Sequence, residues 1–457
     1  MDTYTQVVSP ETQQALANCH PLVGDDWEQM SGRIPVDVEG LAEETQALQR
    51  KRAVRSARDL LRLVLAYSVC DWSLRLVGLW ASVIGLAQLS DVAVRKRLLK
   101  TQRWLGRMIG AWLQQRRQQV GLQAVIVRLI DASVVSQPGS RGTDWRLHVN
   151  FDLGTFSIAS VEVTDGGGGE TLARQSVQAG EILVADRGHA HRRGLGHVLA
   201  ASAYAVVRIN GSNLPLESAD GQSIDLLHWL QAEPPADQPR EQAVWLTTPQ
   251  GRFALRLIAQ ALPQAAAERA RRRVRETSRK KGHTPSPLSL VAAGFLLVVT
   301  NLPAQPWATA QVLALYRVRW QVELLFKRLK GIVDLEALRT KDPVLAQVYL
   351  LGKLLGVLML EDWHNALTGD LDDWLTDPVR PLSAWRWLQL WTDLLRHAIR
   401  GPLTLPRLLA ALPRLGRYLR DAPRQRPAQG ALARQWLRAF GIKAELPEVK
   451  PHAAVPA

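Results

Sequence analysis

The chain has 457 residues with a hydrophobic share of 47%, enough for two to four domains around sizeable cores. Its 57 lysines and arginines exceed its 42 aspartates and glutamates, and the net charge of +15 indicates a polyanionic partner, DNA or RNA. The two cysteines, Cys19 and Cys70, stand at no metal-ligand spacing, which argues against a zinc site and for a reducing cytoplasm.

Neither an export signal nor a membrane span is expected. The polar start, MDTYTQVVSPETQQ, is unlike a signal peptide. The most apolar windows, around 288–300 and 345–360, are too short to cross a membrane or are interrupted by Lys353.

The first part of the chain, residues 1–118, is expected to be helical. Within it, the stretch 79–105 resembles a helix–turn–helix motif, with Ser90 as a suitable N-cap for the second helix. That helix carries the cations Arg95 and Arg97, which could contact DNA. Alternatively, it is an ordinary amphipathic helix whose basic face is solvated.

Two apolar runs predict buried strands that each end at an aspartate. Residues 124–130 lead to Asp131, and residues 181–185 lead to Asp186. If the two strands are parallel neighbours, both aspartates lie at the carboxyl edge of the sheet, where ligand sites of open α/β sheets cluster. Taken alone, either aspartate could simply end its strand or cap the following helix.

The stretch between these runs predicts a hairpin. Residues 145–154 and 156–165 alternate in hydrophobicity as antiparallel strands do. The glycines at 166–169 are followed by no Gly-Lys-Ser/Thr, so they are interpreted as a flexible connection rather than a phosphate loop. The other carboxylates here are expected to be structural, although Asp152 is the alternative to Asp131; they are Asp144, Asp152 and Asp165.

Charged and titratable side chains also follow Asp186. His189, His191 and His197 are expected to lie at a helix start and on its surface rather than to bind metal. Two cations in the same stretch are better placed to contact phosphate, and they are Arg187 and Arg192.

Beyond a last core strand at 205–211, residues 213–290 are expected to form an insertion that is mostly β. The insertion ends in a basic segment with eight Arg or Lys in the thirteen positions 269–281. Such dense like charge repels itself unless a polyanion neutralises it, so Arg272 and Arg273 are predicted to contact the DNA backbone. The alternative is a solvated basic helix.

Four polar residues recur at helical spacing near position 320. On one helix, Tyr316, Arg319, Glu323 and Lys330 fall in a stripe roughly 60° wide, with apolar residues opposite. One carboxylate among cations and a phenol suits a metal held beside a phosphodiester. The alternative is a solvated face with i,i+4 ion pairs worth only a few tenths of a kcal/mol each.

The spacing Y-x2-R-x3-E-x6-K, with Trp320 after the arginine, resembles the YREK motif of bacterial insertion-sequence transposases of the DDE class. Further stretches resemble blocks of the same family: DAS at 131–133, GTDWRLHVNFD at 142–152, ADRG at 185–188 and VVTNLP at 298–303. The resemblance covers roughly residues 120–340.

For the fold, the resemblance implies an α/β protein with an RNase H-like mixed-sheet core. The core would consist of residues 119–212 and 291–365, separated by the insertion at 213–290. Helical regions would flank it, with a DNA-end-binding region at 1–118 and a possible dimer contact at 366–457. The last residues, 443–457, are expected to be disordered.

For the site, the resemblance implies that Asp131, Asp186 and Glu323 bind Mg²⁺ or Mn²⁺, with two ions about 3.5–4 Å apart. The residues expected to contact phosphate or DNA are Tyr316, Arg319, Trp320, Lys330, Arg187, Arg95, Arg97, Arg272 and Arg273.

The implied activity is cleavage at the ends of an insertion sequence and strand transfer into target DNA. The partners would be double-stranded DNA, as terminal inverted repeats and target, and a second copy of the chain, with no membrane. The location would be the bacterial cytoplasm, at the nucleoid. The rival hypotheses are a catalytically inactive relative kept as a DNA-binding repressor and a basic RNA-binding protein; neither needs three carboxylates.

Overall fold

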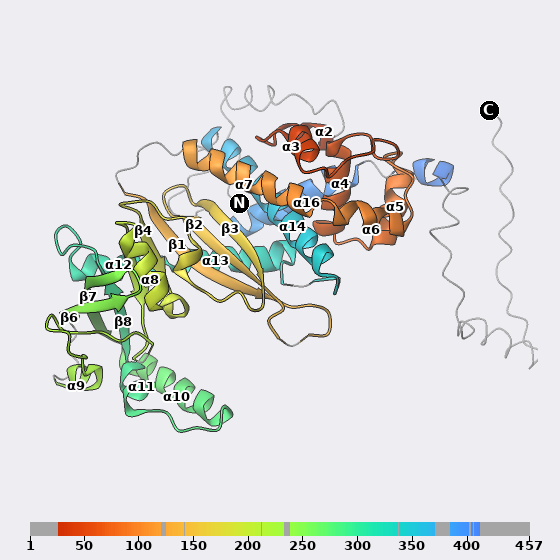
Figure 1. Cartoon of the computed structure of the whole chain (residues 1–457). Helices are drawn as coiled ribbons and strands as arrows, with labels where there is room; N and C mark the ends of the chain where they lie inside the picture. Colours follow the sequence, from red (N-terminus) through yellow and green to blue (C-terminus); the bar gives the residue numbers. More distant parts are fainter. Residues whose placement is uncertain are drawn as a thin grey trace, which may run out of the picture.

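Eight strands form one mixed sheet, in the order β3-β2-β1-β4-β5-β8-β7-β6 (Figure 1). The computed structural model describes residues 26–119, 125–140, 142–211, 213–232, 238–336, 338–370, 384–401, 404 and 406–411. The strands are β1 (Val127–Val135), β2 (Trp145–Asp152), β3 (Ser157–Asp165), β4 (Ile182–Ala185), β5 (Tyr204–Arg208), β6 (Arg240–Thr248), β7 (Gly251–Ala261) and β8 (Phe295–Thr300).

The centre of the sheet is parallel, as predicted. Strand β1 pairs with β4 up to Ile130 and Ala185, and β4 pairs in parallel with β5. Strand β1 does not end at Asp131, contrary to expectation. It continues to Val135, because the antiparallel partner β2 supplies hydrogen bonds as far as Trp145.

Neighbouring residues of the central strands face opposite sides of the sheet. Leu129 and Val184 belong to the core shared with α12 (Thr309–Val318), α13 (Trp320–Val333) and the helices beyond. Ile130 and Ala185, one position further along, belong to a second core that includes residues of α8 (Arg192–Ala200). The sheet is therefore covered on both faces, which explains why its strands are apolar runs.

The insertion extends the sheet. Its hairpin β6–β7 joins the central strands through β8, which pairs antiparallel with both β7 and β5. The remaining elements of the insertion are helices: α9 (Leu226–Gln231), α10 (Gln264–Lys280) and α11 (Pro287–Ala292). The expected insertion is thus a mixture of strand and helix, and its expected end at 290 falls inside α11.

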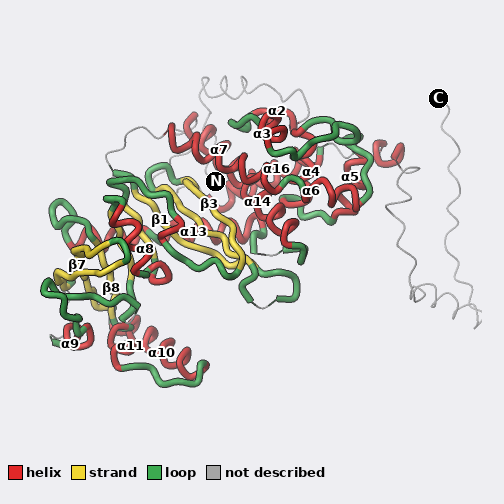
Figure 2. Tube along the Cα trace, in the orientation of Figure 1, coloured by secondary structure: helices red, strands yellow, loops and turns green. Residues whose placement is uncertain are grey.

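The α10–α11 pair lies at the same edge of the sheet as the strand ends that carry the aspartates. Ile209, just past β5, donates to the carbonyl of Leu297 near the start of β8 (3.0 Å). Because β4 and β5 are parallel, the start of β8 lies at their carboxyl end. Figures 1 and 2 show α10 and α11 projecting from this end of the sheet, with α9 beside α11 and far from the N-terminal helices.

The N-terminal helices pack with two later helices into one helical body. They are α2 (Asp26–Gly32), α3 (Val38–Glu44), α4 (Ala57–Ser68), α5 (Leu74–Val83), α6 (Asp91–Leu99) and α7 (Gln102–Gln119). Helix α14 (Pro343–Asp370) packs against α4, α6 and α7, and α16 (Ala384–Arg400) against α2, α4 and α14. The expected boundary at 365 therefore falls inside α14. Residues 1–25, 371–383 and 412–457 lie outside the described part, as does the segment expected to be disordered.

Helix α14 contains a stretch that is long and apolar enough to cross a membrane, Pro343–Trp363, with 21 residues. As the sequence indicated, Lys353 interrupts this apolar segment. Within the fold, most of the segment is buried. Its Lys353 is 1% exposed and donates to the carbonyls of Val333 and Asp334 at the end of α13. The helix therefore has the burial of a core helix and stabilises the end of α13.

Candidate active site

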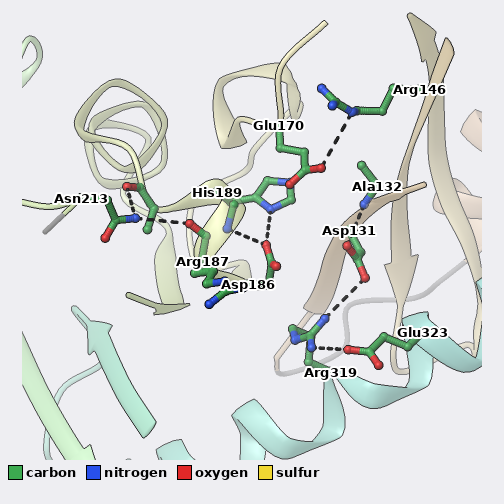
Figure 3. A network of polar contacts seen from close by, with 12 residues as sticks. Asp131, Ala132, Arg146, Glu170, Asp186, Arg187, His189, Asn213, Arg319 and Glu323 are labelled. Carbon is green, nitrogen blue, oxygen red and sulfur yellow. Dashed lines mark hydrogen bonds and ion pairs between the residues drawn. The ribbon is translucent and has the colours of Figure 1, made fainter. Parts of the chain in front are cut away.

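Asp131 and Asp186 lie side by side at the carboxyl edge of the sheet (Figure 3). Each directly follows a member of the last parallel pair between β1 and β4, Ile130 and Ala185. Their side chains are 17% and 32% exposed, so both are accessible from one side of the sheet.

Glu323 faces Asp131 from α13, with the guanidinium of Arg319 between them. Arg319 Nη1 is 3.4 Å from Asp131 Oδ2, and Nη2 binds Glu323 Oε1. The structure thus brings the three predicted carboxylates to one place (Figure 3), but a cation separates two of them.

The two aspartates have opposite pKa shifts. Burial raises the pKa of Asp131 to about 6, although the Ala132 N–H and the Arg319 guanidinium oppose it. Burial acts in the same direction on Asp186, but the hydrogen bond and charge of His189 and the Gly188 N–H outweigh it, so its pKa is lowered. Asp131 therefore holds its proton more tightly than an ordinary aspartate does, and Asp186 holds it less tightly.

His189 is buried, so the expectation that it lies on the helix surface was wrong. The chain makes a 3₁₀ turn from Arg187 to His189, N-capped by Asp186, and this turn buries the imidazole. Nδ1 of His189 donates to Asp186 Oδ1 across 3.1 Å. The expectation does fit His191, which is exposed.

Glu170 lies beside Asp186 and His189, which the sequence did not predict. Glu170, Asp186 and His189 offer ligand atoms that all lie within 4.8 Å of one another. The ligand atoms of Asp131, Asp186 and Glu323, three of the described residues, do not all lie within that distance of one another. The only signal for Glu170 was its position directly after the glycine run.

The predicted YREK helix is two helices, α12 and α13, that meet at Arg319. The backbone tightens there, because Arg319 donates to Tyr316 O (3.2 Å) and Val322 to Arg319 O (3.1 Å), as in a 3₁₀ turn. Tyr316 is 7% exposed, so it does not share an exposed face with the others. The Tyr316 hydroxyl and Arg319 Nε are buried without a hydrogen-bond partner among the described residues, which leaves two donors for a ligand beside the carboxylates.

The remaining predicted residues of this segment lie further out. Trp320 is 49% exposed, and Lys327 Nζ lies 4.6 Å from its ring centre. Lys330 is about 10 Å beyond Glu323 along the helix axis. It pairs with Glu336 at 3.4 Å, so it is not brought to the carboxylates.

The residues outside α12 and α13 that were predicted to contact DNA differ in how exposed their side chains are and in whether they are already paired. Ser90 N-caps α6 as predicted, but Arg95 on that helix binds Asp342, next to the start of α14. Arg97 is half-buried. Exposed side chains are Arg187, Arg192, Arg272 and Arg273, the last two on α10.

The alternative aspartates have structural roles. Asp152 is buried in an ion pair with Arg128, which precedes Asp131 on β1. Asp144 accepts from the Gln137 N–H at 2.9 Å. Asp165 accepts from the N–H of Gly167 at 3.0 Å.

The sheet order, the paired aspartates and the glutamate on a facing helix define an RNase H-like enzyme of phosphoryl transfer. The Transposase DDE domain family matches residues 125–360, and the chain belongs to this family. It is a DDE transposase, an enzyme that acts on DNA, and membership implies the use of a divalent metal.

Two relatives illustrate the similarity. Over 348 residues the chain is 35% identical to the transposase for insertion sequence element IS421 of Escherichia coli, covering 74% of this chain and 94% of that protein. It is 23% identical over 367 residues to the transposase for insertion sequence element IS231F of Bacillus thuringiensis subsp. israelensis, covering 71% and 76%.

Proposed function

We propose that this transposase cleaves DNA at the ends of an insertion sequence and joins the freed 3′ ends to target DNA. Asp131, Asp186 and Glu323 are its metal ligands. The observation that carries the proposal is the position of the two aspartates directly after the last parallel pair of β1 and β4, with Glu323 facing Asp131 across Arg319. Relatives over most of the chain are named as transposases for insertion sequence elements.

The ligand set fits Mg²⁺ or Mn²⁺. It consists of hard carboxylate oxygens, and one of them, on the half-buried Asp131, has a raised pKa, so a bound cation would favour its ionised form. Two such ions, when bound, would activate the attacking water or 3′-hydroxyl and stabilise the departing oxyanion.

Arg319 has two roles in the proposed cycle. Without DNA it forms ion pairs with Asp131 and Glu323. With DNA, its planar fork fits two oxygens of one phosphate, and its unpaired Nε and the Tyr316 hydroxyl add donors. Together with Trp320, exposed at the start of α13, these residues support assignment to the YREK class.

DNA contacts away from the metals are proposed on the N-terminal region and on α10. Residues 1–118 would bind the terminal inverted repeats, with Arg95 released from Asp342 for that contact. The exposed Arg272 and Arg273 would bind backbone phosphates without reading sequence. Because two ends must be cut together, the active form would be a dimer on DNA, with residues 366–457 as its contact, in the cytoplasm at the nucleoid.

The experiment is to incubate the full chain with Mg²⁺ and linear DNA carrying the flanks of its gene, beside the Glu323→Gln variant. The expected result is cuts at the flanks by the wild type and none by the variant. Specific binding without cuts, in Mn²⁺ as well, would instead favour the DNA-binding repressor and overturn the catalytic assignment.

A further inference from the structure

We propose that Glu170 is a fourth carboxylate of the metal centre, binding the metal on the Asp186 side. This inference rests on the proposed function and names a ligand beyond Asp131, Asp186 and Glu323. Its first support is the group of Glu170, Asp186 and His189, whose ligand atoms lie within 4.8 Å of one another. The Glu170 side chain is 30% exposed and that of Asp186 32%, so a cation can reach both.

The turn that carries Asp186 leaves room for the Glu170 carboxylate. A Cβ atom on Gly188 would overlap Glu170 Oε2 and would lie 3.1 Å from Asp186 Oδ1. Gly188 is not among the residues with positive φ, so a side chain at this position would mainly displace the Glu170 carboxylate from where it now lies. The space between the Asp186 turn and the preceding loop is therefore shaped to admit the Glu170 side chain.

The glycine run delivers Glu170 to this position. A Cβ on Gly166 would overlap the Thr143 carbonyl, and one on Gly168 would overlap the Thr164 side chain, so only glycine permits this tight path. Arg146 Nη1 then donates to the Gly168 carbonyl at 2.6 Å. The run is thus a packed turn and not the flexible connection that the sequence had suggested.

Two further contacts fix the backbone on either side of Glu170. Arg174 Nε donates to the Gly169 carbonyl at 3.1 Å. Thr171 N-caps the short helix that follows, which packs against α8. A carboxylate held by its backbone on both sides needs little reordering to bind a cation, which lowers the entropic cost of binding.

The charges around Glu170 leave its oxygens available. Glu170 forms an ion pair with Arg146, whose Nε lies 3.8 Å from Oε1, too long for a hydrogen bond. The alternative is that Glu170 only neutralises Arg146. His189 completes the group by holding Asp186 Oδ1, which leaves Oδ2 of Asp186 free to share a cation with Glu170.

The test measures Mn²⁺ binding to the full chain by titration calorimetry, without DNA. Glu170→Gln keeps the shape and removes the charge, and Gly188→Ala displaces the carboxylate while keeping it. We expect both variants to bind Mn²⁺ roughly 10–100-fold more weakly than the wild type. Glu44→Gln, an exposed carboxylate on α3, is the matched control and should bind as the wild type does. Far-UV circular dichroism and thermal unfolding in EDTA check that each variant is folded.

Asp186→Asn separates the two proposals. If Asp186→Asn loses Mn²⁺ affinity while Glu170→Gln binds as the wild type does, the proposed function stands and the role of Glu170 is wrong. If the wild type shows no saturable Mn²⁺ binding, or Asp186→Asn leaves it unchanged, both are overturned. Should Gly188→Ala unfold, Glu170→Gln alone decides the outcome.

Discussion

The imidazole of His189 is held against Asp186, with Nδ1 3.1 Å from Oδ1 and only 2% of the histidine side chain exposed. Such a buried hydrogen bond orients a carboxylate and keeps it ionised. His189 does not need to touch DNA or metal to matter. It acts as a positioning residue through Asp186.

Replacing this histidine should therefore weaken catalysis. We expect His189→Ala to lower the cleavage rate by roughly 10–100-fold, because Asp186 loses its orienting donor. Mn²⁺ affinity should fall in parallel, a change that a loss of DNA contact would not produce. His191→Ala, two residues away and exposed, is the control. Equal Mn²⁺ affinities for wild type and His189→Ala would contradict the role.

Variants of Arg319 should show whether its positive charge alone, or the bidentate geometry of its guanidinium, supports cleavage. Arg319→Lys keeps one positive charge but loses the fork that binds Asp131 and Glu323 together. We expect both Arg319→Lys and Arg319→Ala to lose at least about 100-fold in cleavage, since neither holds a phosphate bidentately. Arg319→Ala should bind Mn²⁺ more tightly than the wild type in the absence of DNA, because a competing cation is gone. Weaker Mn²⁺ binding by Arg319→Ala in calorimetry would refute this view.

The parts of the fold that the sequence predicts are those with local signals. The runs before Asp131 and Asp186 are short, apolar and rich in β-branched residues, and they are strands because both faces are covered. Alternation likewise predicted the β2–β3 hairpin. The side-by-side aspartates follow from these local features once the two strands pair in parallel.

The parts that the sequence does not predict depend on contacts between distant segments. Glu170 joins the site because the glycine run packs against Thr143 and Thr164, which no periodicity expresses. The ion pair between Arg95 and Asp342 spans 247 positions of sequence. The break at Arg319 is a local change in backbone hydrogen bonding, so the helical pattern of side chains continues through it.

The buried carboxylate of Asp131 should reduce stability at neutral pH. Its folded pKa of about 6 lies above the ordinary value of 3.8, so the folded state binds the proton more tightly and this group's contribution falls as pH rises from about 4 to 6. We expect Asp131→Asn to raise the free energy of unfolding at pH 7.5 by on the order of 1–3 kcal/mol in EDTA. Urea unfolding measures the change. A less stable Asp131→Asn would show that Arg319 already compensates the charge.

Lys353 should give a pH dependence of the opposite sign. Burial lowers its pKa from 10.5 to about 8, so between these values the unfolded state binds more protons and stability rises with pH. Lys353→Met has no titrating group at this position, so this pH dependence is absent in the variant. We expect the stability difference between wild type and variant to shift in favour of the wild type by about 2 kcal/mol from pH 7.5 to 9.5. Urea unfolding at both pH values measures it, and a constant difference would mean that Lys353 keeps an ordinary pKa.

The basic helix α10 should contribute to DNA affinity through charge alone. The helix projects from the same end of the sheet as Asp131 and Asp186, and its Arg272 and Arg273 are exposed. If both bind phosphates, changing both to alanine should lower the slope of log K against log salt concentration by about 1.8, equally for flank and unrelated DNA. Fluorescence anisotropy between about 50 and 200 mM salt covers the useful range. The double lysine variant keeps the charge and should retain the wild-type slope. An unchanged slope in the alanine variant would mean that α10 is a solvated arm and that the DNA follows another path from the active site.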